Sequence, residues 1–216
     1  MTTSVPESKF WQQGDMVVGI DEAGWGPLAG PLFFGGVVFD PALIPPGLND
    51  SKQLVAKRRR TLYSVIKGKA LVALTTQVPA LVFDQQSPNA AWQQGAREIV
   101  QACLLAARAL GHTGRVVYLV DGIKRIILDK VVQAEVTLHY APRLDAEAPS
   151  VSAASILAKV EHDYCMDQLA AKYPEYDFSH NSGYGTVKHI AALRKYGIVE
   201  GVHRRQYVTS ALTNKE

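Results

Sequence analysis

Short apolar runs alternate with longer amphipathic segments along this chain, which is the pattern of an α/β protein. Apolar runs rich in β-branched residues predict buried strands over residues 16–20, 33–39, 70–78, 115–122 and 134–140. Segments with apolar residues three or four positions apart predict helices over residues 51–68, 89–111, 150–173 and 186–197. We expect a loop over residues 41–50 and a frayed tail over residues 206–216.

The order of these elements predicts a single domain. Strands come first in a block and then alternate with helices, which favours one mixed sheet flanked by α-helices. No internal repeat, low-complexity tract or linker interrupts the chain. A chain of 216 residues, of which 47% are hydrophobic, is long enough to bury a sizeable core in one domain.

Composition and charge change this picture little. A net charge of +3 permits a nucleic-acid partner without arguing for one, because the distribution of charge matters more than its sum. Cys103 and Cys165 lack the spacing of metal ligands, so we expect two buried free thiols in a reducing compartment. The N-terminus has no signal-peptide pattern and no apolar run could span a bilayer, so we expect a cytoplasmic protein with no membrane partner.

Acidic residues stand where predicted strands end. Asp21 and Glu22 follow the first strand, and Asp121 ends the fourth. Strand ends on one edge of an α/β sheet are where sites tend to form, and a carboxylate after an apolar run is costly unless it is paired or bound to a metal. Further acids that could join them, without the sequence deciding which do, are Asp145, Glu147, Asp163 and Asp167.

Converging carboxylates of this kind point to a divalent-cation site. Their mutual repulsion raises their pKa values unless cations intervene, and a ligand set made only of oxygens suits Mg²⁺ or Mn²⁺. Two such ions about 4 Å apart stabilise both the attacking and the leaving oxygen of a phosphodiester displacement. The chain has no Cys/His set for zinc, no GxxxxGK[ST] loop and no GxGxxG fingerprint.

Several segments, in the same order along the chain, resemble those of the ribonuclease HII family, the type 2 ribonucleases H. They are GIDEAGWGPLAGP, LNDSKQL, YLVDG, SAASILAKVEHDY, KYPEYDFSHNSGYGTVKHIAALRKYG and VHRRQY. The resemblance implies a ribonuclease H-like fold with a catalytic domain at residues 16–208, an N-terminal extension at 1–15 and a C-terminal tail at 209–216. It also implies two divalent ions, Mg²⁺ or Mn²⁺, in the catalytic cycle.

The resemblance assigns roles to individual residues. The catalytic, metal-binding carboxylates would be Asp21, Glu22, Asp121 and Asp145. Substrate would be bound by Gly24, Trp25, Gly26, Lys52, Tyr184 and Arg204. Supporting roles would fall to Ser155, Lys159 and Asp163.

The family hydrolyses the phosphodiester 5′ to a ribonucleotide, leaving 3′-hydroxyl and 5′-phosphate ends. The resemblance therefore implies a partner that is an RNA–DNA hybrid or a duplex DNA containing ribonucleotides, with a place in ribonucleotide excision repair. The 2′-hydroxyl is the group by which a protein distinguishes RNA from DNA at one nucleotide, and glycines such as Gly24 and Gly26 let the backbone approach it. Nothing in the sequence suggests more than a monomer.

Trp25 departs from the family pattern, because it stands where the Gly-Arg-Gly motif has arginine. An indole stacks but does not donate the paired hydrogen bonds of a guanidinium to a phosphate, so one alternative is a hybrid nuclease with altered junction specificity. Another alternative is a non-catalytic hybrid-binding protein, which predicts loss of a metal-binding acid, and none is lost.

Basic residues and histidines outside these motifs carry weaker expectations. The run at 57–60 spreads its charges over more than one face of a predicted helix, which favours a solvated surface over a groove contact. His180, His189 and His203 are expected at the surface or beside the site.

Overall fold

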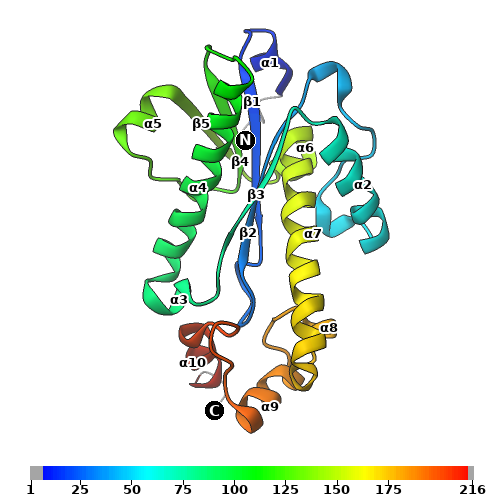
Figure 1. Ribbon diagram of the computed structural model, residues 1–216, viewed down its shortest axis with the longest axis vertical. Coiled ribbons are helices and arrows are strands. Elements are labelled where there is room, and N and C mark those ends of the chain that lie inside the picture. Colours follow the sequence, from blue (N-terminus) through cyan, green and yellow to red (C-terminus); the bar gives the residue numbers. More distant parts are fainter. Residues whose placement is uncertain (1–6, 214–216) are drawn as a thin grey trace.

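The computed structural model describes residues 7–213, and the strands of these residues form one five-stranded mixed sheet (Figure 1). The strand order is β3-β2-β1-β4-β5. The first three strands pair antiparallel, whereas β4 and β5 extend the sheet from β1 in parallel pairing. Their bounds are β1 Met16–Ala23, β2 Leu32–Val38, β3 Val72–Val78, β4 Val116–Asp121 and β5 Val136–Ala141.

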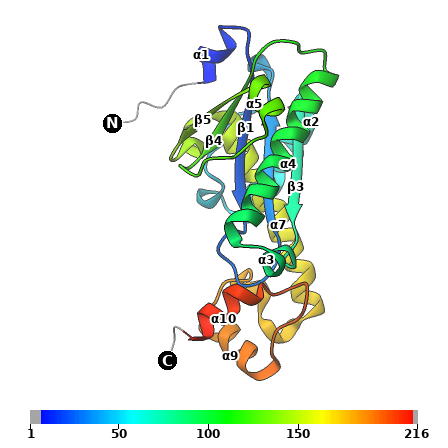
Figure 2. The same ribbon diagram turned by 90° about the vertical axis from the view of Figure 1, so that its left-hand side faces the viewer.

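Helices cover both faces of this sheet (Figure 2). Helix α4 packs on β2 and β3, α7 lies against β1 and β2 on the opposite face, and α2 packs on α7. The longer helices are α2 Ala56–Lys69, α4 Pro88–Ala109, α7 Pro149–Lys172, α9 Val187–Tyr196 and α10 Arg205–Thr213. The short helices are α1 Glu7–Trp11, α3 Val82–Gln85, α5 Lys130–Glu135, α6 Leu144–Glu147 and α8 Phe178–Asn181, with 3₁₀ turns at Pro41–Leu43, Ser51–Gln53 and Pro174–Tyr176.

Strand β2 shows how the sequence builds these layers. Its side chains alternate between the two faces, as they must in an extended strand. Phe34 and Val38 are buried in the cluster that contains the inner face of α4, whereas Val37 is buried with residues of α2 and α7. The strand is therefore apolar on both sides, and its burial throughout explains why it reads as a continuous hydrophobic run.

Helix α7 approaches the sheet so closely that only glycine fits beneath it. A Cβ atom on Gly19 would lie 2.1 Å from the backbone carbon of Ser150, and one on Gly35 would lie 2.2 Å from the carbonyl oxygen of Ala154. The two glycines lie on the adjacent strands β1 and β2. These two glycines thus allow the short distance between the sheet and α7, the helix that directly follows α6.

The C-terminal part of the chain forms a second cluster at the far end of α7 (Figure 1). Helices α8, α9 and α10 gather there below the sheet, around a core that includes Tyr176, Phe178 and Leu193. This C-terminal unit also bonds to the loop after β1. Leu28 N–H donates to the carbonyl of Gly183 at 2.8 Å, and Gly30 N–H donates to that of Val202 at 2.9 Å.

The predicted mixed sheet flanked by helices is confirmed, but some element boundaries are wrong. The helix predicted at 51–68 begins at Ala56, after a 3₁₀ turn at Ser51–Gln53. The strand predicted at 134–140 begins at Val136, because the Asp129 carboxylate accepts hydrogen bonds from two backbone N–H groups and starts helix α5 before it.

The tail predicted as frayed is helix α10 as far as Thr213, and residues 214–216 lie outside the described residues. The Asp84 carboxylate, far away in sequence, accepts a hydrogen bond from Arg205 N–H at 2.7 Å at the start of this helix. The expected extension at 1–15 contains helix α1, and its residues 1–6 lie outside the description. Both cysteines are free; Cys103 is buried as expected, whereas Cys165 is partly exposed. Within residues 7–213 no helix has the length and hydropathy needed to cross a membrane.

We expect Gly35→Ala to lower the free energy of unfolding by about 3 kcal/mol, because the added methyl group meets the Ala154 carbonyl and must displace α7. Gly68→Ala is the matched control, since Gly68 lies in α2 with open space around it and alanine favours a helix by up to about 1 kcal/mol. Urea denaturation measures both. Equal stability of the two variants would contradict the close packing of α7.

Candidate active site

Three aspartates from three different elements meet at one end of the sheet. Asp21 lies near the end of β1, Asp121 ends the neighbouring parallel strand β4, and Asp145 lies on α6. Each offers a carboxylate oxygen, and these three oxygens lie within 4.8 Å of one another. Parallel strands end at the same edge of a sheet, which explains why acids so distant in sequence come together.

Backbone groups hold two of these carboxylates in place. The Glu22 N–H donates to Asp21 Oδ1 at 2.7 Å, and the Leu144 N–H donates to Asp121 Oδ1 at 2.7 Å. The second bond joins the end of β4 to the start of α6. Asp145 follows directly on this turn, so the bond that orients Asp121 also fixes the segment that carries Asp145.

Burial and mutual repulsion raise the pKa values of these acids. Burial is the main cause for Asp21, which is only 8% exposed, and the charges of Glu22 and Asp121 raise its pKa further. The pKa of Asp145 is raised to about 6, first by burial and then by Asp121 and Asp50. Carboxylate oxygens that repel one another in this way fit a divalent cation, because the positive charge of the ion would offset the repulsion.

Glu22 lies beside the three aspartates but not within their close group. Its pKa is raised by burial and by Asp121, while the positive charges of Lys124 and Lys52 favour its ionised form. The buried indole N–H of Trp92 also faces this carboxylate and lowers its pKa, although it does not reach hydrogen-bonding geometry. Glu22 is thus the acid at the rim, between the aspartates and two lysines.

The Gly-Trp-Gly loop begins two residues after Glu22, directly after the end of β1. Gly24 has a φ of 94°, and a Cβ atom there would lie 2.5 Å from the ring of His162, so only glycine suits the position. A Cβ atom on Gly26 would lie 3.4 Å from the ring of Tyr184, which is 50% exposed. The half-exposed tyrosine of the C-terminal unit therefore lies next to this loop.

Arg204 holds this loop from inside the protein. Its guanidinium donates to the carbonyl oxygens of Gly24 at 2.6 Å, Trp25 at 2.9 Å and Gly30 at 2.9 and 3.0 Å. It also lies 4.1 Å from the centre of the Phe83 ring. The side chain is 0% exposed, so it does not fit the direct substrate contact that the sequence suggested. Its position makes it a support for the loop.

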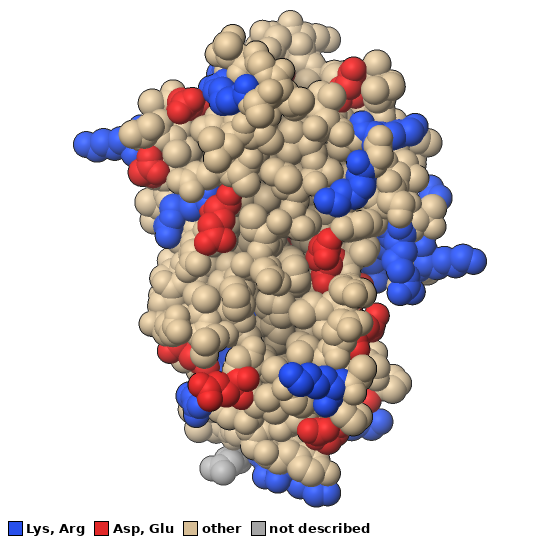
Figure 3. All heavy atoms as spheres, in the orientation of Figure 1, with Lys and Arg blue, Asp and Glu red and all other residues tan. Residues whose placement is uncertain are grey.

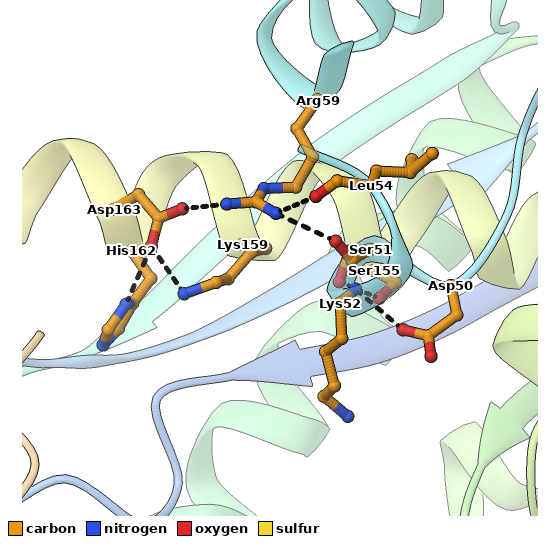
Figure 4. Close-up of polar contacts among 9 residues, drawn as sticks. All are labelled: Asp50, Ser51, Lys52, Leu54, Arg59, Ser155, Lys159, His162 and Asp163. Carbon is orange, nitrogen blue, oxygen red and sulfur yellow. Dashed lines mark hydrogen bonds and ion pairs between the residues drawn. The ribbon is translucent and has the colours of Figure 1, made fainter. Parts of the chain in front are cut away.

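Asp163 anchors a second support, shown in Figure 4. It pairs with Arg59 at 3.0 Å and with Lys159 at 2.6 Å. Burial opposes its charge, but the nearby ring of His162 and the hydrogen bonds from Lys159 and Arg59 hold its pKa well below the usual range. Lys159 and Asp163 therefore pair with each other and do not join the group of three aspartates.

The same network holds the turn that carries Lys52 (Figure 4). Arg59 donates to the carbonyl oxygens of Ser51 and Leu54, and the Ser155 hydroxyl donates to Ser51 Oγ at 2.8 Å. Ser155 also lowers the pKa of Asp21, so it links the turn to the acids. The expectation of a solvated surface at 57–60 is wrong for Arg59, whose side chain is 13% exposed.

Sequence reasoning missed several neighbours of the site. Asp50 stands beside Lys52 in the segment LNDSKQL but was not counted among the acids, although its charge raises the pKa of Asp145. Lys124 follows Asp121 by three residues, and only that proximity could have indicated it. Of the two positions expected for His189 and His203, the surface is wrong, because both rings are buried against each other in the C-terminal unit.

A model of the ribonuclease HII family matches residues 18–210. The chain belongs to the ribonuclease HII family. Ribonuclease HII of Delftia acidovorans is 41% identical over 204 residues, which cover 93% of this chain and 79% of the relative. The solved structure of ribonuclease H2 from Pyrococcus horikoshii OT3 superimposes with a TM-score of 0.70 at 26% identity, over 92% of this chain and 98% of its own.

A further solved structure, Bst-RNase HIII in complex with Mn²⁺, superimposes with a TM-score of 0.69 over 94% of this chain and 70% of its own. At 17% identity that likeness shows the fold alone. Together these neighbours confirm the ribonuclease H-like fold. Membership of the ribonuclease HII family makes this chain a hydrolase, an endonuclease of the ribonuclease H type.

We expect Mg²⁺ or Mn²⁺ to stabilise the protein more at pH 7.5 than at pH 5. The folded pKa of Asp145 is about 6 against an ordinary 3.8, so the folded state binds more protons than the unfolded state between those values. The metal-free protein therefore loses stability as the pH rises through that window. At an ion concentration about 100-fold above Kd, thermal unfolding should shift by roughly 5–10 °C at pH 7.5.

Asp145→Asn serves as the control for this experiment. It removes the titrating group, so the stability of the variant should vary less between pH 4 and 6 and its shift with the ion should be smaller. An equal shift at both pH values in the unsubstituted protein would contradict a cation site that includes Asp145.

We expect Arg204→Met to lower the free energy of unfolding by about 3 kcal/mol, because it leaves the buried carbonyls of Gly24, Trp25 and Gly30 without their donor. The neighbouring Arg205→Met removes the same charge at an exposed position and should change stability by less than about 0.5 kcal/mol. Chemical denaturation of both variants decides the matter. Similar midpoints would show that Arg204 does not support the loop.

Proposed function

We propose that this protein hydrolyses the RNA strand of RNA–DNA hybrids and the phosphodiester 5′ to ribonucleotides embedded in duplex DNA. The products would carry 3′-hydroxyl and 5′-phosphate ends. The observation that supports this most is the convergence of Asp21, Asp121 and Asp145, with Glu22 at their rim, beside a glycine loop and an exposed tyrosine.

Two divalent cations, Mg²⁺ or Mn²⁺, would be held by Asp21, Glu22, Asp121 and Asp145. The donor set fits them, because it consists only of carboxylate oxygens, and burial and neighbouring acids raise the pKa values of Asp21 and Asp145. When bound, such ions lower the pKa of a water nucleophile and stabilise the charge on the leaving oxygen. The chain itself positions the carboxylates through the backbone N–H groups of Glu22 and Leu144.

The Gly-Trp-Gly loop would recognise the ribonucleotide through its backbone. Arg204 occupies the carbonyl oxygens of Gly24 and Trp25. Within residues 7–213, the N–H groups of Trp25 and Gly26 have no hydrogen-bond acceptor. These two donors are therefore available to a 2′-hydroxyl or an adjacent phosphate oxygen. Tyr184, half-exposed beside Gly26, would stack on the neighbouring sugar.

The alternative of altered junction specificity rests on Trp25. The contacts of this side chain help to evaluate that alternative. Its ring lies 6.2 Å from that of Phe83, and the Lys124 ammonium lies 4.0 Å from its centre. The indole is therefore engaged with the protein and takes no free stacking position of the kind that Tyr184 has. This arrangement favours recognition by the loop backbone over recognition by the side chain of Trp25.

We expect Asp121→Asn to slow cleavage by about 1000-fold, because loss of one carboxylate charge weakens ion binding and removes several kcal/mol of transition-state stabilisation. Asp167→Asn, at an exposed position on α7, is the matched control and should cleave at the unsubstituted rate. Single-turnover assays in Mg²⁺ and in Mn²⁺ would use two substrates, a long RNA–DNA hybrid and a DNA duplex with one embedded ribonucleotide.

The pattern over the two substrates separates the proposed function from its alternatives. Cleavage of both substrates by the unsubstituted protein supports the proposed function. Cleavage of the long hybrid alone would indicate altered junction specificity. Binding of both substrates with cleavage of neither would indicate a non-catalytic hybrid-binding protein.

A further inference from the structure

Lys124 lies between two tryptophan side chains at the rim of the acid cluster. Its ammonium nitrogen is 4.0 Å from the centre of the Trp25 ring and 4.3 Å from that of Trp92. One indole belongs to the loop after β1 and the other to α4, so two elements far apart in sequence hold one lysine. A cation over an aromatic face is attracted by the negative charge of that face, which favours this position.

The segment that carries Lys124 is itself fixed to the protein. The buried side chain of Gln93 donates to the carbonyl oxygen of Arg125 at 2.8 Å and accepts from Ile127 N–H at 2.9 Å. Ile126 N–H donates to the hydroxyl of Tyr140 at 3.0 Å. These three bonds lie within three residues of Lys124, so the lysine is carried by an ordered loop whose backbone is held in place.

The charge of Lys124 has no ion-pair partner among the described residues. Glu22 lies near enough to favour the charged form but not within ion-pair distance, and partial burial lowers the pKa of the lysine. The indole faces attract the cation without accepting its N–H groups in conventional hydrogen bonds. Among the described residues the ammonium makes no conventional hydrogen bond, so a donor that does not face a ring is open to an oxygen acceptor that arrives from outside.

A single placed cation matters on this protein because the middle of the visible surface carries few basic side chains. On the face drawn in Figure 3, basic side chains gather at the right-hand edge, over α2, and elsewhere acidic and basic side chains are interspersed. The net charge of the whole chain is only +3. Away from that edge, a polyanion would therefore be bound through individual lysines and arginines at fixed positions.

We propose that Lys124, held between the indoles of Trp25 and Trp92, contacts a backbone phosphate of the bound duplex next to the acid cluster. This inference rests on the proposed function, since it takes a nucleic acid as the substrate. The contact supplies a positive charge beside the Gly-Trp-Gly loop, whose own side chains are uncharged. It positions the phosphodiester without a base contact, so it is independent of the nucleotide sequence.

The test measures binding, not cleavage, as a function of salt concentration. In an Asp121→Asn background with Mg²⁺, fluorescence anisotropy would follow binding of a labelled duplex with one embedded ribonucleotide. Lys124→Met keeps the long apolar stem between the indoles but removes the charge. We expect it to weaken binding about fivefold near 0.1 M salt and to reduce the slope of log K against log[salt] by about 1.

Two further variants complete the design. Lys124→Arg keeps the charge and should retain the salt slope. Lys67→Met removes a lysine that also lies over an aromatic ring, 5.9 Å from the centre of Tyr63, and bonds to Ala73 on the edge strand β3; it should leave the slope unchanged. If Lys124→Met unfolds, as circular dichroism would show, Lys124→Gln gives the same comparison.

An unchanged salt slope in the folded Lys124→Met protein, with binding retained, would overturn the proposal and leave Lys124 only a neighbour of Glu22. This result differs from failure of the proposed substrate class. If the substrate is not a nucleic acid of this kind, the Asp121→Asn protein would bind neither the ribonucleotide-containing duplex nor a long hybrid, whatever residue stood at position 124. Loss of cleavage with binding retained would bear on the proposed activity and leave this binding test valid.

Discussion

The contact between α7 and the backbone of β1 and β2 sets the positions of the functional groups. Gly19 and Gly35 leave no side chain between the strands and the helix, so Ser150 and Ala154 rest on the sheet itself. Interiors are packed too densely to absorb a shift of even one methyl group without cost. The start of α7 is therefore fixed relative to β1, and with it the short helix α6 that carries Asp145 towards the acids of the strands.

The site contains carboxylates that repel one another, and it also contains positively charged groups that reduce this repulsion. Asp21, Asp121 and Asp145 repel one another in a partly buried place, and burial penalises them further. Among residues 7–213, no ion pair engages these three carboxylates. Lys52 and Lys124 lie nearby instead, at a distance that favours the charge of Glu22 and leaves the carboxylate oxygens open to a cation.

The sequence was informative where a residue's role follows from its own neighbours. Asp21 and Asp121 each follow an apolar run, so the sequence predicted that both acids lie at the ends of strands. The order of the apolar runs and helical segments predicted the mixed sheet. It was uninformative where a role depends on contacts between distant segments. The burial of Arg204 depends on carbonyls about 175 residues earlier in the chain, and the start of α10 on a carboxylate 121 residues earlier. The position of Lys124 between the indoles of Trp25 and Trp92 likewise needs three segments that only the fold brings together.

The C-terminal unit that carries Tyr184 is fastened to the rest of the molecule along two edges. One edge is the unbroken helix α7, and the other is the loop after β1, which is bonded to it through Leu28, Gly30 and Arg204. Two attachments on different sides resist rotations that either one alone would permit. The half-exposed Tyr184 is thereby held beside the Gly-Trp-Gly loop. A group that is already held in place before a ligand arrives loses less conformational entropy when the ligand binds.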